Sequence, residues 1–292
     1  MPVELLKIKA DRFAESLTEI RENYIRGGVT LIEDYALPAD LVELDIRIVE
    51  DTGGDYDNFL KKARQREFDK DLSNWPDHIL KYYTDERAEA ERIRAAMQLS
   101  QEHVREMFAR LFPNLGEITS ACSWRATITK DEDYHLDVYP DDRITLRAFY
   151  NFDTMDRVWG YGHSAFDLFD QVSASRDEIR GFLNSGITEK RFLNLLNERL
   201  PEVAPKEYRF PPRSLWFADS QKVAHQIKFG RRAAMFTYYA PLKTKARTGL
   251  QFNETAREHY RIALSPGAVL RRRLRSSIRQ GRQRLKGPAR GA

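Results

Sequence analysis

His135 and Asp137 stand one residue apart in the stretch "DYHLDVYP", residues 133–140, whose aromatic and β-branched composition predicts a strand. Alternate residues of a strand lie on the same face, so the imidazole and the carboxylate are expected side by side. A carboxylate on a buried strand face is costly unless a cation pairs with it or a metal ion binds it. The pair therefore predicts half of a metal site. The alternative is a chance pair of polar residues, because a His-x-Asp spacing alone has a high false-positive rate.

His225 is the candidate third ligand. It lies in "SQKVAHQIKFG", a strand-like segment far downstream of the His-x-Asp pair. Two histidines and one carboxylate are the ligand set of non-haem Fe(II) oxygenases, and they leave positions on the ion open for reactants. Of the other histidines, His163 follows a predicted strand and is a candidate for a substrate pocket, whereas His78, His103 and His259 lie in helical or charged surroundings.

Two arginines are candidates for binding an anionic cosubstrate. Arg147 lies in "RITLRAF", on the strand predicted directly after the His-x-Asp pair, where its apolar neighbours require it to have a partner. Arg232 follows a glycine turn close to the distal histidine. A guanidinium suits this role because its planar fork binds a carboxylate through two parallel hydrogen bonds. The alternatives are a structural ion pair for Arg147 and a solvated turn for Arg231 and Arg232.

The composition predicts a folded, cytoplasmic protein. With 292 residues, a hydrophobic fraction of 41% and an aromatic fraction of 11%, the chain can bury a sizeable core. No apolar run approaches the roughly 20 residues that span a bilayer, and the amino terminus lacks a secretory pattern. Cys122 is the only cysteine, which excludes disulfide frameworks and thiolate metal sites.

The elements follow one another in an order that favours an α+β fold. Helical spacing runs through residues 1 to about 30, and the β-branched run "VTLIEDY" follows it. Charged helical segments occupy about 58–113, and short aromatic segments divided by Asp, Pro and Gly then predict strands. A helical insert at about 165–200 interrupts these strands. The best match is a double-stranded β-helix, the jelly roll of cupins, with flanking helices.

Three regions are expected along the chain. A mainly helical N-terminal region (1–115) packs on a jelly-roll core with its insert (116–245), and a basic tail (246–292) follows. Residues 271–292 hold nine Lys or Arg and no acidic residue, and taking these from the net charge of +4 leaves −5 for the rest of the chain. The strongly basic tail and the mildly acidic body therefore point to two separate roles.

The tail has the pattern of a helix that lies on a membrane. Leu270, Leu274 and Ile278 recur every four residues, which on a helix gives a narrow apolar stripe along a cationic cylinder. The partner expected for residues 268–292 is thus an anionic membrane surface. A disordered solubilising tail and nucleic acid are the alternatives. Nucleic acid is disfavoured because no zinc finger, helix-turn-helix spacing or aromatic-basic strand accompanies the charges.

The order "SWR…YHLDVYP…LRAFYNFD…RVWGYGHSAF…FPPRSLWFADSQKVAHQIKFG" resembles the Fe(II)/2-oxoglutarate-dependent oxygenases and, within them, the Kdo (3-deoxy-D-manno-octulosonic acid) hydroxylase group. The resemblance covers residues from about 120 to 241. For the superfamily it rests on His135, Asp137 and His225. For the narrower group it rests on the run "FPPRSLWF" and on Arg125, Pro140, Arg147, Asn151, Arg157, Trp159 and Trp216. Arg231 and Arg232 depart from that group.

The resemblance implies an iron enzyme. His135, Asp137 and His225 would hold Fe(II), and 2-oxoglutarate would chelate the ion while Arg147 or Arg232 binds its far carboxylate. The expected oxidant is O2, 2-oxoglutarate would be split to succinate and CO2, and ascorbate is a candidate reductant. Related halogenases have a small residue at the position of Asp137, so its carboxylate favours hydroxylation.

The resemblance also implies a substrate, an anionic sugar of a lipid-linked glycan such as the Kdo of the lipopolysaccharide inner core. The residues expected to contact this sugar are Arg125, Trp124, Arg157, Trp159 and His163. The expected location is the cytoplasm, peripherally at the inner face of the cytoplasmic membrane.

Two other functions stay open. The same oxygenase chemistry could act on an amino acid or a small natural product, and the basic tail would then be dispensable for activity. A metal-free jelly-roll binding module with a tail for an anionic polymer is the alternative outside the enzymes. Metal content distinguishes these classes, because a binding module would purify without stoichiometric iron.

Overall fold

The computed structural model describes most of the chain. The described residues are 3, 5–47, 84–130, 132–139, 143–171, 177, 180–181, 193–194, 196–198, 200, 205–241 and 249–261, without the side chains of 120–129, 168–169, 171 and 253. Two predictions therefore concern segments outside the described residues: the membrane contact of residues 268–292 and the helical segments at 58–83.

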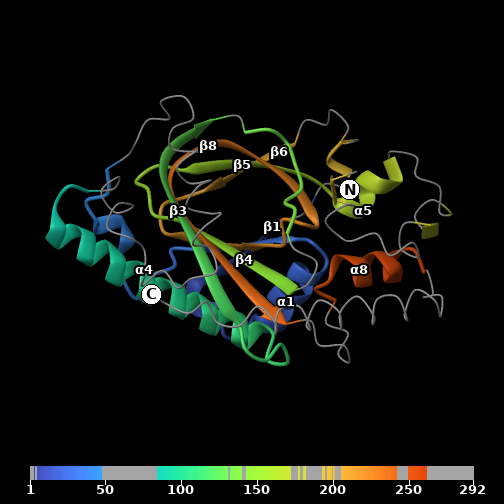
Figure 1. Cartoon of the computed structure of the whole chain (residues 1–292), viewed down its shortest axis with the longest axis horizontal. Helices are drawn as coiled ribbons and strands as arrows, with labels where there is room; N and C mark the ends of the chain where they lie inside the picture. Colours follow the sequence, from blue (N-terminus) through green and yellow to red (C-terminus); the bar gives the residue numbers. More distant parts are fainter. Residues whose placement is uncertain are drawn as a thin grey trace, which may run out of the picture.

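One curled sheet of eight strands forms the body of the described structure (Figure 1). Along the sheet the order is β1-β2-β7-β4-β8-β5-β6, and β3 also pairs with β8. Among the strands that the structure describes, only β1 and β2 pair in parallel; the other pairs are antiparallel. The strands are β1 (Leu5–Lys9), β2 (Val29–Glu33), β3 (Thr119–Lys130), β4 (Arg143–Asn151), β5 (Arg157–Ser164), β6 (Lys206–Phe210), β7 (Ser214–Ala218) and β8 (Val223–Pro241).

Strand β8 joins the two halves of the sheet. Its first part, Val223–Phe229, pairs with β5, and its second part pairs with both β3 and β4. Gly230 lies where the partners change, and a Cβ on it would fall 2.3 Å from a guanidinium nitrogen of Arg157. A larger residue there would force the buried Arg157 side chain to shift, so Gly230 lets β8 and Arg157 approach closely where the partners of β8 change.

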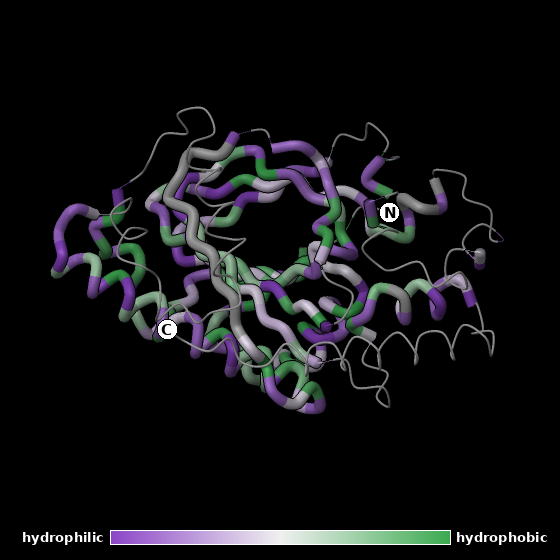
Figure 2. The backbone as a smooth tube through the Cα atoms, in the orientation of Figure 1, coloured by the Kyte–Doolittle hydropathy of each residue, from purple (hydrophilic) through white to green (hydrophobic). Residues whose placement is uncertain are grey.

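Helices cover one face of the sheet. Figure 1 shows α1 (Leu17–Ile25) and α4 (Arg87–Leu111) below β3, β4 and β8, while α5 (Ala165–Gln171) and α8 (Phe252–His259) lie toward the right end. Short 3-10 turns occupy Ala10–Arg12 and Leu41–Glu43. The buried positions of α4 recur at helical spacing, and Figure 2 shows the matching alternation of hydrophobic and hydrophilic segments along it.

Strand β4 is buried on both faces, but the two faces differ in chemistry. Ile144, Leu146, Ala148 and Tyr150 pack in the core under α1 and α4. The residues between them point to the inner side of the curled sheet and include the buried Thr145, Arg147 and Asn151. A strand with no exposed face therefore supplies a row of polar side chains to the interior of the sheet.

The inner side of the sheet holds a second core rich in aromatic residues. Phe149, Trp159, Tyr161, Phe210 and Trp216 pack there through ring contacts between neighbouring strands. The polar groups on this side lie against these rings: the guanidinium of Arg147 on β4 lies over Phe149, and the imidazole of His225 on β8 stacks on Trp159. A jelly roll with flanking helices, as predicted, is confirmed.

The prediction of a helix from residue 1 to about 30 is only partly right. Residues 17–25 are helical, but Leu5–Lys9 form β1 and pair in parallel with β2. In "LLKIK" the apolar residues also fit the alternation of a strand, and pairing with β2 decides between the two structures. The N-terminal region therefore adds two strands to the sheet, and the region expected to be tail begins with the packed helix α8.

No helix among the described residues combines the length and the apolar character that crossing a bilayer requires.

Candidate metal centre

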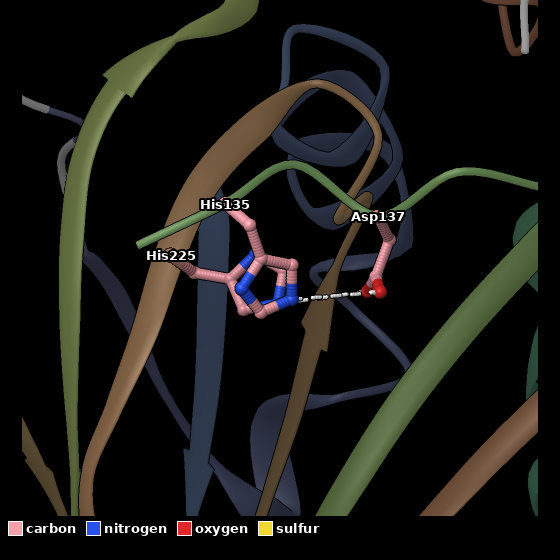
Figure 3. Close-up of side chains that lie close together, drawn as sticks. All are labelled: His135, Asp137 and His225. Carbon is pink, nitrogen blue, oxygen red and sulfur yellow. Dashed lines mark ion pairs between the residues drawn. The ribbon is translucent and has the colours of Figure 1, made fainter. Parts of the chain in front are cut away.

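His135, Asp137 and His225 come together at the inner side of the sheet (Figure 3), and one ligand atom from each lies within 4.8 Å of the others. The Nε2 atoms of His135 and His225 lie 3.8 and 3.5 Å from the two carboxylate oxygens of Asp137. The side chain of His225 is 4% exposed, whereas those of His135 and Asp137 are 30% and 23% exposed. The cluster is thus closed behind His225 and reachable from the other side.

The segment that carries His135 and Asp137 was predicted to be a strand, but it is extended without forming a regular strand. It joins the sheet through one isolated bridge, in which His135 and His225 exchange two backbone hydrogen bonds of 2.9 Å. The N–H of Asp137 donates to the carbonyl of Ser220, also at 2.9 Å. The alternation expected of a strand still holds, because Leu136 points the opposite way into a separate apolar cluster.

Both imidazole rings are held in the same tautomer. Nδ1 of His135 lies 2.6 Å from the carbonyl of Asp133, and Nδ1 of His225 lies 3.2 Å from the carbonyl of Val223. A carbonyl oxygen can only accept, so Nδ1 carries the proton in each ring and Nε2 keeps its lone pair. Both lone pairs then belong to the nitrogens nearest to Asp137, which is the arrangement found in metal-ligating histidines.

The environment of His225 keeps its ring neutral and fixed. Burial, with smaller contributions from His135 and Arg147, lowers the pKa of His225 to about 3. The indole of Trp159 stacks on the imidazole with ring centroids 5.3 Å apart and an interplanar angle of 11°. A neutral imidazole in one orientation is what metal ligation requires.

Arg147 lies directly beside the three residues. Its guanidinium donates to a carboxylate oxygen of Asp137 and, at 2.7 Å, to the hydroxyl of Ser220. The same group lies 4.7 Å above the ring of Phe149 and 5.3 Å from the ring of Tyr139. Arg147 is 7% exposed, so it places a positive charge in a mostly dry part of the interior next to Asp137.

The loop between β7 and β8 holds Ser220 in place through a buried ion pair. Lys222, which is fully buried, lies 3.2 Å from Asp219 and also donates to the carbonyls of Ile25 and Gly249. Burial raises the pKa of Asp219, and the charge of Lys222 opposes that shift. The loop is therefore tied to α1 and to the segment before α8, which fixes the carbonyl that Asp137 binds.

The other candidate for the cosubstrate, Arg232, has a different place. Its guanidinium donates at 2.6 Å to the carbonyl of Ile46, in the core under the helices. Alternation along β8 puts it on the same face as Ala234 and Phe236, which pack in that core, and not on the face of Met235. Its neighbour Arg231 binds the buried Asp153 through Nε at 2.7 Å.

Of the residues predicted to contact the sugar, Arg157 and Trp159 are each only 2% exposed. The guanidinium carbon of Arg157 lies 5.6 Å from the Trp159 ring, which in turn stacks on His225. This placement favours a supporting role behind a candidate ligand over the predicted contact with substrate. His163 is half-buried, and its N–H donates to the hydroxyl of Tyr134 at 3.3 Å.

The remaining two, Trp124 and Arg125, lie on β3, where their backbones pair with Ala234 and Ala233 of β8. Their side chains lie outside the described residues, so their contact with substrate stays a prediction.

The donor set fits a divalent transition metal. Two imidazole nitrogens and a carboxylate form the facial triad of non-haem iron sites. Ligand atoms on a six-coordinate ion with bonds of about 2.1 Å stand roughly 3 Å apart, and the separations of 3.5 and 3.8 Å from Asp137 are close to that value. Within the described residues this is the one cluster of three such side chains.

Sequence reasoning missed two of the residues that support this cluster, Ser220 and Asn197, and gave a third, Trp159, a different role. Ser220 binds both Asp137 and Arg147, Trp159 supports His225, and Asn197 binds the backbone of Leu136. Ser220 and Asn197 are common residue types in segments with no distinctive pattern. Trp159 was found, but burial behind His225 cannot be inferred from a strand that is aromatic throughout.

Comparison with known proteins shows which fold this is. Similar solved structures include the Kdo hydroxylase KdoO, a non-heme Fe(II) alphaketoglutarate dependent dioxygenase. Its apo structure gives a TM-score of 0.57 at 16% identity, covering 87% of this chain and 92% of that one. Its complex with succinate and Fe(III) gives 0.54 at 16% identity, covering 86% and 92%, and its complex with alphaketoglutarate and Fe(III) gives 0.54 at 15%, covering 87% and 92%. No protein-family model and no curated protein matches the chain.

We predict that replacing His135, Asp137 or His225 with Ala weakens Fe(II) binding by at least about 100-fold. Loss of a residue that only supports a ligand costs about 10- to 100-fold in metal affinity, and loss of a ligand itself should cost more. Anaerobic titration of the apo-protein measures this. His259→Ala is the matched control, because His259 lies away from the cluster beside Asp170. Stoichiometric Fe(II) binding by one of the three variants would remove that residue from the site.

Proposed function

We propose that this protein is an Fe(II)/2-oxoglutarate-dependent hydroxylase that acts on an anionic sugar of a lipid-linked glycan, such as Kdo. The observation that carries the proposal is the cluster of His135, Asp137 and His225, with both Nε2 lone pairs and a carboxylate converging inside a jelly roll. The likeness of the fold to the Kdo hydroxylase KdoO supports the same conclusion.

Bound Fe(II) and 2-oxoglutarate would supply the oxidising chemistry, in which O2 converts 2-oxoglutarate to succinate and CO2 while the substrate gains a hydroxyl group. The task of the chain is to hold the reactants and exclude water. Backbone carbonyls orient both imidazoles, and the stacked Trp159 closes the space behind His225. The exposed sides of His135 and Asp137 leave one direction of approach for a substrate.

Arg147 is the cation that best fits the far carboxylate of 2-oxoglutarate. It lies on the inner face beside Asp137, and its guanidinium could bind a carboxylate through two hydrogen bonds. The hydroxyl of Ser220, 2.7 Å from the guanidinium, is a further donor at the same place. Arg232 lies on the opposite face of β8, where its guanidinium donates to the carbonyl of Ile46, so it does not point toward Asp137.

The substrate is the finer part of the proposal. Support for an anionic sugar comes from the sequence resemblance and from the fold likeness to a Kdo hydroxylase. Arg157 and Trp159 are buried behind His225. Of the five residues predicted to contact the sugar, Arg125, Trp124 and His163 are therefore the ones we propose for direct contact. An amino acid or small natural product remains the alternative substrate, and no described contact favours it.

The experiment that tests the function starts from the anaerobic apo-protein with Fe(II) and 2-oxoglutarate. A weak visible charge-transfer band is expected on mixing, and O2 should bleach it. Succinate formation should then increase when a Kdo-containing oligosaccharide is added, and a panel of free amino acids should have no such effect. Absence of the band would contradict the oxygenase, whereas a band with stimulation only by amino acids would contradict the sugar alone.

We predict that Arg147→Ala raises the 2-oxoglutarate concentration for half-maximal turnover by about 10- to 100-fold, the loss of a charged hydrogen-bonded contact of roughly 1.5–3 kcal/mol. Arg232→Ala should change it far less. Steady-state assays at saturating Fe(II) measure both, and an Fe(II) titration of each variant separates cosubstrate binding from the contact of Arg147 with Asp137. If Arg232→Ala raised the required 2-oxoglutarate concentration more than Arg147→Ala, Arg232 would be the residue that binds the far carboxylate.

The same proposal assigns a location to the basic tail. An enzyme of lipid-linked glycans would gain from residues 268–292 binding the cytoplasmic membrane surface, since their cationic residues attract anionic lipids.

We predict that deleting 268–292 weakens binding to vesicles that contain phosphatidylglycerol, because each cation near an anionic surface contributes about 1 kcal/mol. Vesicle co-sedimentation at low and high salt measures this binding. Turnover of a soluble sugar fragment by the truncated protein is the control and should be unchanged. Equal vesicle binding by both proteins would rule out the tail as the anchor.

A further inference from the structure

The segment between the two candidate ligands is held at every backbone N–H by a different part of the chain. The N–H of His135 donates to His225 on β8, and that of Asp137 donates to Ser220 in the loop before β8. The N–H of Leu136 donates to the side-chain oxygen of Asn197, and all three bonds measure 2.9 Å. Asn197 is the only one of these three partners that acts through its side chain, so it can be removed by mutation.

Asn197 makes a second bond to the same residue. Its side-chain nitrogen donates at 2.9 Å to the carbonyl of Leu136. One amide group thus accepts from the N–H and donates to the C=O of a single residue, which copies the bonds that a neighbouring strand would make. This explains how an extended segment with only one bridge to the sheet keeps a fixed conformation.

The two bonds act on the peptide groups adjacent to both ligands. The N–H of Leu136 belongs to the peptide that joins it to His135, and its C=O belongs to the peptide that joins it to Asp137. Because each peptide is planar, holding these two groups fixes the rotation about Leu136 that sets the spacing of His135 and Asp137. A change in that rotation would move one ligand relative to the other.

Apolar packing surrounds the contact between Asn197 and the backbone of Leu136. Leu136 is 1% exposed and packs in one cluster with Leu196, the residue beside Asn197, and with Phe166 and Phe252. Water has little access there, so without Asn197 the N–H and C=O of Leu136 would lose their partners in a buried place. The backbone would then have to shift to reach other partners.

We propose that Asn197 is a positioning residue for the metal centre: its side-chain amide fixes the backbone of Leu136 and thereby the spacing of His135 and Asp137. This inference rests on the proposed metal site. It links a residue of the helical insert to metal affinity, although Asn197 itself offers no ligand to the ion.

The test compares Asn197→Ala and Asn197→Asp with the control Asn194→Ala. Asn194 is exposed in the same insert, and its bond to the N–H of Glu198 uses the backbone carbonyl, which the substitution keeps. Asn197→Asp has nearly the same shape but lacks the donor to the carbonyl of Leu136, so it tests the bond rather than the volume. Mn(II), a redox-stable probe for a nitrogen and oxygen site, is titrated and the free ion is measured by EPR. The melting temperature in chelator reports the fold.

We expect both Asn197 variants to bind Mn(II) about 10-fold or more weakly than the wild type. Asn194→Ala should bind as the wild type does, and all variants should stay folded in chelator. Wild-type affinity per folded molecule in either Asn197 variant would overturn the inference, including the case in which the variant is less stable. Failure of the wild type itself to bind Mn(II) and Fe(II) would instead overturn the proposed function and the inference with it.

Discussion

The paired backbone of His135 and His225 is the constraint on which the site depends. Two hydrogen bonds of 2.9 Å join a short extended segment to the start of β8, and they bring side chains from distant parts of the sequence to one place. Because directly opposed residues of an antiparallel pair share a face, both imidazoles turn to the inner side of the sheet. Asp137, two residues on from His135, then joins them there.

Several polar groups around these residues have defined partners. Carbonyls orient the imidazoles, Ser220 and Asp137 receive the guanidinium of Arg147, and Lys222 pairs with Asp219 under the loop. A buried polar group without a partner costs about 1–3 kcal/mol, so these contacts also exclude other arrangements of the loop. The aromatic core supplies rigid walls, above all Trp159 behind His225.

Similarity of fold and similarity of sequence diverge in this protein. At 15–16% identity over most of both chains, the match to KdoO structures reflects a shared arrangement of strands. A fold alone does not assign a reaction, which is why the argument for an oxygenase rests on the donor atoms of three side chains and on Arg147 beside them. Two residues of the sequence resemblance, Arg157 and Trp159, are buried next to His225, and their predicted contact with substrate stays a prediction.

The sequence by itself determined the types of chemistry available and most of the strands. Histidines are few, so His135 and His225 could be selected by their strand-like surroundings, and β-branched or aromatic runs located β2 and β4. Only the tertiary structure decided that "LLKIK" is a strand, that Arg147 and not Arg232 lies beside Asp137, and that Asn197 binds Leu136 across 61 positions of sequence. Local patterns report the preferences of neighbouring residues. Strand pairing, burial and a side-chain amide bound to a distant backbone depend on contacts that exist only once the chain has folded.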